Sequence, residues 1–373
     1  MKYLVQKKFK LILLLIDIIG NILFFIPNFI LRKKNKIYLE HPKNIVVIRL
    51  DHIGDMVLTT SFFKNLKKNY PESKITVICR ELTIPILKRC EYIDEMIPIN
   101  TLWGNRGEKI EWKKLFRILK ENYKKYDLGF ELHTSPFNII LLRILSKNSI
   151  GYKYRGLGFL LTKGFWNNEK KIHITEKNLN LLENIGGKIF DRSLELKISK
   201  SKIIKDKQDE KWIGLQIISG RENKNWELDK WNKLILKILK SSKNVKIYLL
   251  GSKLDKEKIE NLVINERVIN VAGNFKLDEI IDFINELDLL ISVDTMAVHI
   301  ANALNKKLIA LYGPTNGNIW GPFHKNSVII QGKYNNCYGL ELSKCKYKET
   351  NSCGKCMDNI TVEEVYKKVE ELI

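Results

Sequence analysis

A carboxylate stands where a strand is expected to end and a helix to begin. The apolar run NIVVIRL is followed by Asp51, Gly54 and Asp55 in the loop DHIGD, and then by the helical stretch MVLTTSFFKNLKKNYPES. A carboxylate in such a place can accept a proton from a substrate hydroxyl. It can equally cap the helix, because aspartate is common at helix starts. Both interpretations of Asp55 stay open on the residues alone, and Asp51 is a rival base.

A second turn of this kind follows the run LLISVD far downstream. It places Asp294, Thr295 and His299 at the start of the helical stretch TMAVHIANALNK. Free amides and the helix dipole favour a diphosphate at such a start, and we expect the amides of 295–297 to be free. Thr295 adds a hydroxyl, Asp294 can accept from sugar hydroxyls, and His299 lies about one turn on. The alternative makes Asp294 a helix cap and His299 a buried core residue.

The elements that position these residues alternate between strand and helix along the chain. Such alternation predicts an α/β fold with two Rossmann-like domains, each containing a parallel sheet. Ligands bind at the carboxyl ends of parallel strands, so we expect a two-domain enzyme with a cleft between its halves. The predicted division is a membrane-associating segment at 1–40, a first domain with linker at 41–205, and a second domain at 206–373. The second ends in a cysteine-rich tail and a closing helix.

Composition narrows the class of partner. The 373 residues include 64 basic and 42 acidic side chains, which gives a net charge of +22. That excess suits an anionic partner such as a nucleotide diphosphate, a phosphorylated lipid or a membrane surface. The chain lacks a G-x-x-x-x-G-K-[ST] loop and a G-x-G-x-x-G fingerprint after a strand. No basic and aromatic pattern of a nucleic-acid module stands out, so we expect no nucleic-acid partner.

Residues 11–31 read LILLLIDIIGNILFFIPNFIL, with basic residues on both flanks. We expect an N-terminal hydrophobic helix here, for which three arrangements stay open. It can lie in the membrane interface, span the membrane, or pack on the protein itself. Asp17 and Asn21 are costly at a bilayer centre and Pro27 bends a helix, which favours the interface. The expected location is the cytoplasmic face of the inner membrane, peripheral or N-terminally anchored.

Four cysteines gather near the end of the chain, at Cys337, Cys345, Cys353 and Cys356. Only the last two have the C-x-x-C spacing of a zinc site. A structural zinc with thiolate ligands, reduced thiols and disulfides all stay open. We expect no other metal.

Four motifs resemble those of glycosyltransferase family 9, the lipopolysaccharide heptosyltransferases. IRLDHIGDMVLTTSFFKNLKKNYP is similar to the amino-terminal signature, in which a strand leads through a Gly-Asp loop into a helix. ISGRENKNWELDKWNKL resembles the motif that opens the second domain. DLLISVDTMAVHIANALNKKLIALYGPT resembles the donor-site motif, and the tail ending CMDNITVEEVYKKV is also similar. The resemblance runs from about residue 43 to 373 and leaves out residues 1–40.

The resemblance implies a GT-B enzyme that inverts the anomeric centre without a metal or other cofactor. Its donor is a nucleotide sugar, usually ADP-heptose, and its acceptor is a lipid-linked glycan such as a lipopolysaccharide core. The match makes Asp55 the catalytic base, with Asp51 and Gly54 on the acceptor side. It makes Lys224 the group that stabilises the departing diphosphate, with Arg221 as helper. Another ADP- or UDP-sugar donor and a non-catalytic membrane-bound binding module remain as alternatives.

The resemblance extends to further donor-side residues. Gly313 and Thr315 follow the last predicted strand, where glycine lets backbone approach a ligand, although a tight turn without a ligand explains them too. Gly251 and Ser252 are expected to border the adenosine. Met296 stands where many family members have glycine, which bears on how closely the sugar approaches.

Overall fold

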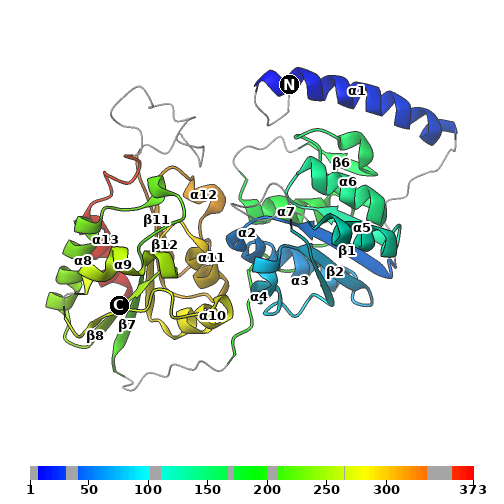
Figure 1. The fold of residues 1–373 in the computed structure, drawn as a ribbon. Helices are drawn as coiled ribbons and strands as arrows, with labels where there is room; N and C mark the ends of the chain where they lie inside the picture. Colours follow the sequence, from blue (N-terminus) through cyan, green and yellow to red (C-terminus); the bar gives the residue numbers. More distant parts are fainter. Residues whose placement is uncertain are drawn as a thin grey trace. The chain divides into compact units, whose positions relative to one another are not determined.

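The computed structural model describes residues 7–30, 41–100, 111–166, 172–199, 209–263, 265–333 and 355–373. The chain divides into two compact units, Met1–Arg192 and Ser193–Ile373, each built around its own sheet (Figure 1). The predicted boundary at 205/206 lies among residues 200–208, outside the described part. Both units show the alternation of strands and helices that the sequence predicts.

The first unit contains a parallel six-stranded sheet in the order β3-β2-β1-β4-β5-β6. Its strands are β1 Asn44–Arg49, β2 Lys74–Cys79, β3 Glu95–Pro98, β4 Tyr126–Glu131, β5 Ser146–Tyr152 and β6 Lys163–Phe165. The strand order reverses between β1 and β4. In open parallel sheets, ligands bind beyond the carboxyl ends of the strands at such a reversal.

Helices cover both faces of this sheet. They are α1 Lys7–Ile30, α2 Ile53–Val57, α3 Thr60–Asn69, α4 Ile84–Leu87, α5 Trp112–Glu121, α6 Pro136–Leu145 and α7 Ile174–Glu183, with short 3-10 turns η1 Glu81–Thr83 and η2 Gly158–Leu160. Leu115 and Ile118 of α5 share one buried cluster with Leu142 of α6 and Ile48 of β1. The helix α1 lies alongside η2 (Figure 1). Of the helices in the described ranges, none has both the length and the apolar character that a membrane crossing requires.

The stretch after β1 differs from the prediction. The sequence predicts a loop through Asp55 and then one helix over 56–73, but the structure has two helices, α2 and α3. Thr59 and Thr60 donate their hydroxyls to carbonyls four and three residues back, at 2.8 Å each. Threonine hydroxyls compete in this way with regular helix bonding, which explains the break. Gly54 and Asp55 therefore lie in a helix and not in a loop.

The second unit repeats the architecture with the order β12-β11-β10-β7-β8-β9, again all parallel. Its strands are β7 Lys211–Gln216, β8 Val245–Leu250, β9 Val268–Asn270, β10 Leu289–Val293, β11 Leu308–Tyr312 and β12 Ser327–Gln331. Its helices are α8 Leu228–Ser241, α9 Lys256–Ile259, α10 Leu277–Glu286, α11 Met296–Ala303, α12 Gly317–Trp320 and α13 Val362–Leu372, with 3-10 turns η3 Glu222–Lys224, η4 Lys253–Asp255 and η5 Glu260–Leu262. The order reverses between β7 and β10, which makes their carboxyl ends the expected ligand edge.

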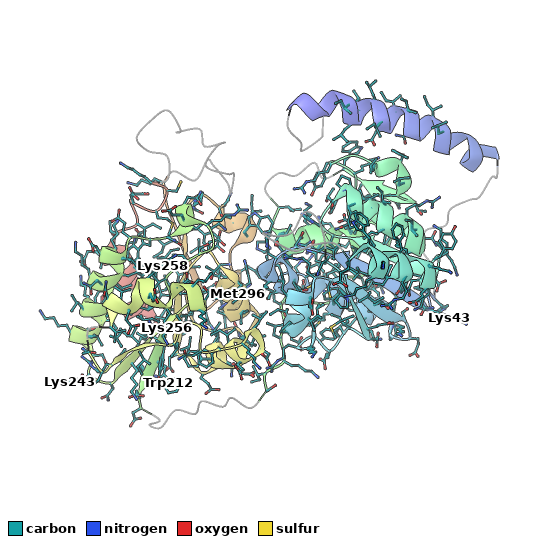
Figure 2. All side chains as sticks on the ribbon, in the orientation of Figure 1. Lys43, Trp212, Lys243, Lys256, Lys258 and Met296 are labelled. Atoms are coloured by element: carbon teal, nitrogen blue, oxygen red, sulfur yellow. The ribbon has the colours of Figure 1, made fainter. Side chains whose placement is uncertain are left out.

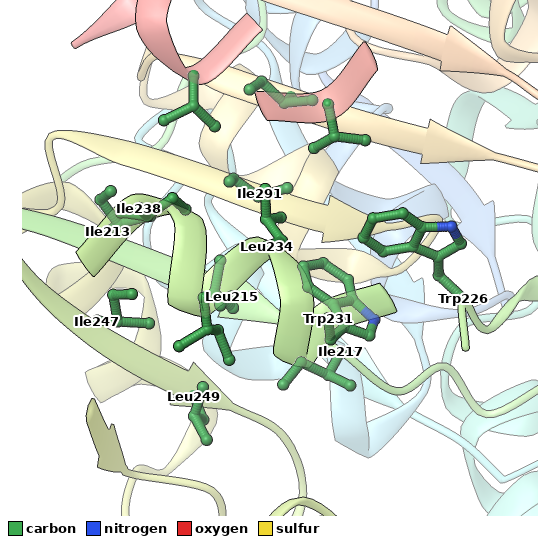
Figure 3. Close-up of a cluster of buried hydrophobic side chains, with 14 of the residues drawn as sticks. Ile213, Leu215, Ile217, Trp226, Trp231, Leu234, Ile238, Ile247, Leu249 and Ile291 are labelled. Carbon is green, nitrogen blue, oxygen red and sulfur yellow. The ribbon is translucent and has the colours of Figure 1, made fainter. Parts of the chain in front are cut away.

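A buried apolar cluster fixes α8 on the second sheet (Figure 3). Leu234 of α8 packs with Leu215 of β7, and the Trp226 and Trp231 rings meet edge to face with centroids 5.1 Å apart. The Trp226 indole also donates to the Ile360 carbonyl at 3.0 Å. Trp226 is thus a core residue, and it anchors the loop that carries Lys224.

Lysines lie on the surfaces of both units. Figure 2 shows Lys43 beside β1 in the first unit and Lys243, Lys256 and Lys258 in the second. This spread accords with a net charge of +22 that runs along the whole chain.

Candidate active site

In the first unit, a buried arginine organises two carboxylates at the carboxyl end of β1. Arg49 is the last residue of the strand, and its side chain is 2% exposed. Its Nε lies 2.9 Å from Asp51 Oδ2, and its Nη2 lies 3.4 Å from Asp55 Oδ1. Its Nη1 donates to the carbonyl of Leu132, which follows β4, at 2.8 Å. The guanidinium therefore ties both carboxylates to the point where the strand order reverses.

Asp51 is held as a charged, internally paired group. Its Oδ1 contacts His133 Nδ1, and its backbone carbonyl accepts from Arg80 at 3.4 Å. Burial alone would raise the pKa of Asp51, but Arg49 and the hydrogen bond from His133 hold that pKa below its usual value. A carboxylate with these partners is a weak proton acceptor. Asp51 is predicted on the acceptor side, which stays a prediction; the structure shows it paired with Arg49 and His133.

Asp55 has the opposite electrostatics in the same cluster. Burial and then the charge of Asp51 raise the pKa of Asp55, although Arg49 acts against the rise. Its side chain keeps 17% exposure, against 6% for Asp51. Asp55 is not the helix cap, because the residue at the cap of α2 is His52 and Asp55 lies in the first turn. A partly open carboxylate with a raised pKa suits general base chemistry.

Glu131 shapes the turn that carries His133. The carboxylate is fully buried at the end of β4. It accepts hydrogen bonds from the His133 amide at 3.0 Å, from the Asn138 side chain at 3.0 Å, and from the Thr134 amide. Burial raises the pKa of Glu131 despite these bonds. Sequence reasoning missed Arg49, Glu131 and His133 as members of the site. The signal was present, since Arg49 and Glu131 end apolar runs that form strands and His133 follows the second of them closely.

In the second unit, the two predicted donor-side charges pair with each other. Lys224 Nζ lies 2.5 Å from Asp294 Oδ2, with side-chain exposures of 16% and 7%. Lys224 ends the turn after β7 and Asp294 directly follows β10, so the pair sits at the strand-order reversal. The Ser219 hydroxyl also reaches the Asp294 carbonyl at 3.5 Å. An ammonium held there can stabilise a departing diphosphate. The exposed Arg221 lies three residues away.

The turn into α11 contradicts the alternative in which Asp294 caps the helix, and it contradicts the expectation that the amides of 295–297 are all free. Thr295, and not Asp294, is the cap residue, and its hydroxyl accepts the Ala297 amide at 3.2 Å. The amide of Ala297 is therefore not free, as the sequence analysis expected. Met296 begins the helix and is labelled in Figure 2. His299 is 6% exposed, and every residue of α11 after Met296 is buried, so His299 is buried as the alternative interpretation expected.

The glycine at the end of β11 has a packing role. A Cβ on Gly313 would lie 2.6 Å from the Met357 sulfur, so the residue permits close approach of the C-terminal segment. Gln331 Nε2 donates to the carbonyls of Gly313 and Thr315 at 2.9 and 3.2 Å and so orders the loop. The Thr315 hydroxyl is buried and has no hydrogen-bond partner in this part of the structure.

Gly251 and Ser252 lie at the carboxyl end of β8, on the same sheet edge. The Ser252 hydroxyl donates to Asp255 Oδ2 at 2.6 Å, and both residues form the capping box of η4. Their polar groups are thus already engaged in the helix start. The edge position agrees with a place beside a nucleoside, which stays a prediction.

The zinc prediction falls mostly outside the described residues, since Cys337, Cys345 and Cys353 lie within 334–354. Cys356 is described and is buried in the second unit. In the ranges that the structure describes, no three histidine, cysteine or acidic side chains are grouped as metal ligands.

Comparison with known proteins points to one family. The sequence profile of glycosyltransferase family 9 (heptosyltransferase) matches residues 112–350, more than half of the 373 residues. Lipopolysaccharide heptosyltransferase 3 of Escherichia coli is 28% identical over 301 residues, which covers 74% of this chain and 85% of that protein. Lipopolysaccharide heptosyltransferase 1 of Campylobacter coli is 26% identical over 353 residues, which covers 88% and 98%.

A solved structure shares the fold. The E. coli heptosyltransferase WaaC, solved with ADP-2-deoxy-2-fluoro heptose, has a TM-score of 0.67 at 16% identity and covers 88% of this chain and 99% of its own. The two parallel six-stranded sheets therefore form an α/β fold of the heptosyltransferase type.

Proposed function

The chain belongs to glycosyltransferase family 9 and is a glycosyltransferase, and we propose that it transfers heptose from ADP-heptose to a lipopolysaccharide core or a related surface glycan. The observation that carries the mechanism is the contrast between the two carboxylates after β1. The pKa of Asp55 is raised and that of Asp51 is lowered within one cluster. Environments that separate two pKa values in this way assign the base.

Asp55 would take the proton of the acceptor hydroxyl while the hydroxyl oxygen attacks the anomeric carbon of the donor. The new carbon–oxygen bond forms opposite the breaking bond to the diphosphate, so the anomeric configuration inverts. Arg49 orients the Asp55 carboxylate from 3.4 Å and keeps its pKa from rising further. Asp51 and His133 hold Arg49 from the other side, because Arg49 Nε also pairs with Asp51.

The second unit would receive the donor at the carboxyl ends of β7 and β10. Lys224 would turn toward the diphosphate as negative charge develops on it, and the first turn of α11 would face the same group. Asp294, released from Lys224, would accept hydrogen bonds from the sugar. The Thr315 hydroxyl, buried and without a partner in the described structure, supports a ligand contact here.

A different ADP- or UDP-sugar is the second candidate donor. Met296 favours such a donor. This half-buried methionine is the first residue of α11, at a position where many family members have glycine. A bulkier residue at this position alters the space that a sugar can occupy.

Calorimetric titration with ADP and UDP, followed by transfer assays with ADP-heptose, tests the proposal. We expect binding of ADP, weaker or no binding of UDP, and a loss of ADP affinity in Lys224→Ala. The matched control is Lys246→Ala. Lys246 lies on β8 of the same unit, and its ammonium pairs with Glu210. Binding of UDP in preference to ADP would replace the donor, and equal ADP affinity in Lys224→Ala would remove Lys224 from the site.

A further inference from the structure

One side of α1 is closely fitted to the first unit. Asp17, 6% exposed, accepts the backbone amide of Leu157 through its Oδ1 at 2.8 Å. A Cβ on Gly20 would lie 2.4 Å from the Phe159 ring, so only glycine lets the helix approach η2 this closely. The aspartate that the sequence analysis counts against membrane insertion is therefore used in a contact with the protein.

The loop that receives α1 has an unusual backbone. Gly156 and Leu157 both have positive φ angles, of 95° and 59°. A left-handed conformation is unfavourable for leucine, and the hydrogen bond that the Leu157 amide donates to Asp17 offsets part of that cost. A Cβ on Gly156 would also lie 2.8 Å from Leu13, on the same side of α1. The docked side of the helix is thus defined by Leu13, Asp17 and Gly20.

Between residues 12 and 23, where the side chains of α1 are described, the side opposite the docked one is exposed and aliphatic. Successive residues of a helix turn by about 100°, which places the exposed residues away from the docked three. Each of them is between 41% and 62% exposed. We call them the α1 row: Ile12, Leu15, Ile16, Ile18, Ile19, Ile22 and Leu23. A contiguous aliphatic surface of this kind marks an interaction site.

The basic residues that flank α1 in the sequence indicate what kind of partner the row binds. Lys7, Lys8 and Lys10 precede the row in the sequence, and residues 32–36 (RKKNK) follow it. The receiving loop adds Lys153 and Arg155, both partly exposed. A second copy of the chain would bring basic ends together in either orientation of two helices, which is repulsive. An anionic lipid surface provides both an apolar layer for the row and negative charge for the lysines.

We propose that α1 lies in the plane of an anionic lipid surface, with the α1 row immersed and the docked side holding the first unit against that surface. The helix is then a fitted part of the first unit and not a loose tether. This inference concerns lipid binding alone and stands whatever the donor or acceptor of the enzyme.

Vesicle flotation of the full chain, without nucleotide or acceptor, tests the proposal. We expect the protein to float with vesicles of phosphatidylethanolamine and phosphatidylglycerol and to bind phosphatidylcholine vesicles less. Leu15→Ser/Ile19→Ser/Ile22→Ser should reduce the bound fraction by about tenfold or more, because each serine removes an aliphatic side chain from the lipid. Leu254→Ser, at a site 84% exposed in the second unit, is the matched control and should float like the unchanged protein.

Cysteine labelling tests the orientation of the helix in the bound state. A membrane-impermeant maleimide should react with Asn21→Cys, which lies between the two sides of α1, and much less with Ile19→Cys in the row. Protection of both sites by vesicles would show insertion across the bilayer and overturn the in-plane arrangement. Unchanged flotation of the triple serine variant would overturn the lipid assignment. A wild-type dimer that the triple variant converts to monomer, without lipid binding, would assign the row to a second copy.

Discussion

Replacing Asp294 with asparagine separates the two roles given to the ion pair in the second unit. The change keeps the shape of the side chain and removes the charge that lies 2.5 Å from Lys224 Nζ. Opposite charges at that distance attract by about 7 kcal/mol at an effective dielectric constant of 20. Desolvation of both groups offsets most of this attraction. Lys224 keeps 16% exposure and can be hydrated, so we expect a loss of about 1–3 kcal/mol in unfolding free energy.

The same substitution should affect nucleotide and sugar in opposite directions. Without the Asp294 charge, a diphosphate meets an unpaired ammonium, and ADP affinity should rise by about tenfold if roughly 1.4 kcal/mol of competition is removed. Transfer should nevertheless slow, because the sugar loses its carboxylate partner. Calorimetry with ADP and a turnover assay on one preparation measure both effects.

Asp282→Asn is the matched control for this experiment. Asp282 is a buried carboxylate of the same unit that accepts the Ser199 amide at 2.8 Å, away from the ligand edge. It should change neither ADP affinity nor turnover. Weaker ADP binding in Asp294→Asn would contradict the proposed competition, because it would mean that Asp294 supports the binding of the diphosphate.

Three further changes test the first cluster and the donor loop. Asp55→Asn should lower turnover by about 10²–10⁴-fold, and in the unchanged enzyme kcat/KM should fall as pH drops through the raised pKa of Asp55. Because a raised pKa means that the folded state disfavours the charged carboxylate, Asp55→Asn should leave the melting temperature at neutral pH equal or higher, a gain that disappears in acid. Asp51→Asn should lower the melting temperature at neutral pH, and the difference should shrink as pH falls through the depressed pKa, since that stability belongs to the charged form; equal melting curves would count against the pairing. Gly313→Ala should destabilise the fold through its contact with the Met357 sulfur, 2.6 Å from the added carbon. Because Met357→Ala by itself removes a buried core side chain, a double-mutant cycle is the check, and Gly313→Ala should cost less stability in the Met357→Ala background if that contact is the cause.

Local pattern predicts much of this fold, because buried parallel strands read as apolar runs and the helices between them have an apolar side. The runs around β1, β7 and β10 are of this kind, and those of β1 and β10 also locate Asp55 and Asp294 shortly after strand ends, whereas Lys224 was assigned from the resemblance to the family. The short strands β3, β6 and β12 carry weaker patterns and were not predicted.

A local sequence pattern does not show which distant residues come into contact in the folded chain. Lys224 and Asp294 are 70 positions apart, and only the pairing of β7 with β10 brings them together. In the same way, the pairing of β1 with β4 brings His133 to Asp51. The helix break at Thr59 depends on hydroxyl bonds that a periodicity argument does not weigh.

The assignment of Asp55 as the base of an inverting heptosyl transfer is tested with ADP-heptose and a purified core acceptor. NMR gives the anomeric configuration of the product, and the release of ADP is measured in the same reaction. We expect one ADP released for each heptose transferred, a product inverted at the anomeric carbon, and both signals lowered by about 10²–10⁴-fold with Asp55→Asn. A retained configuration, or full transfer by Asp55→Asn, would contradict the assignment of Asp55 as the base. Transfer from a different nucleotide sugar, with none from ADP-heptose, would contradict the proposed donor.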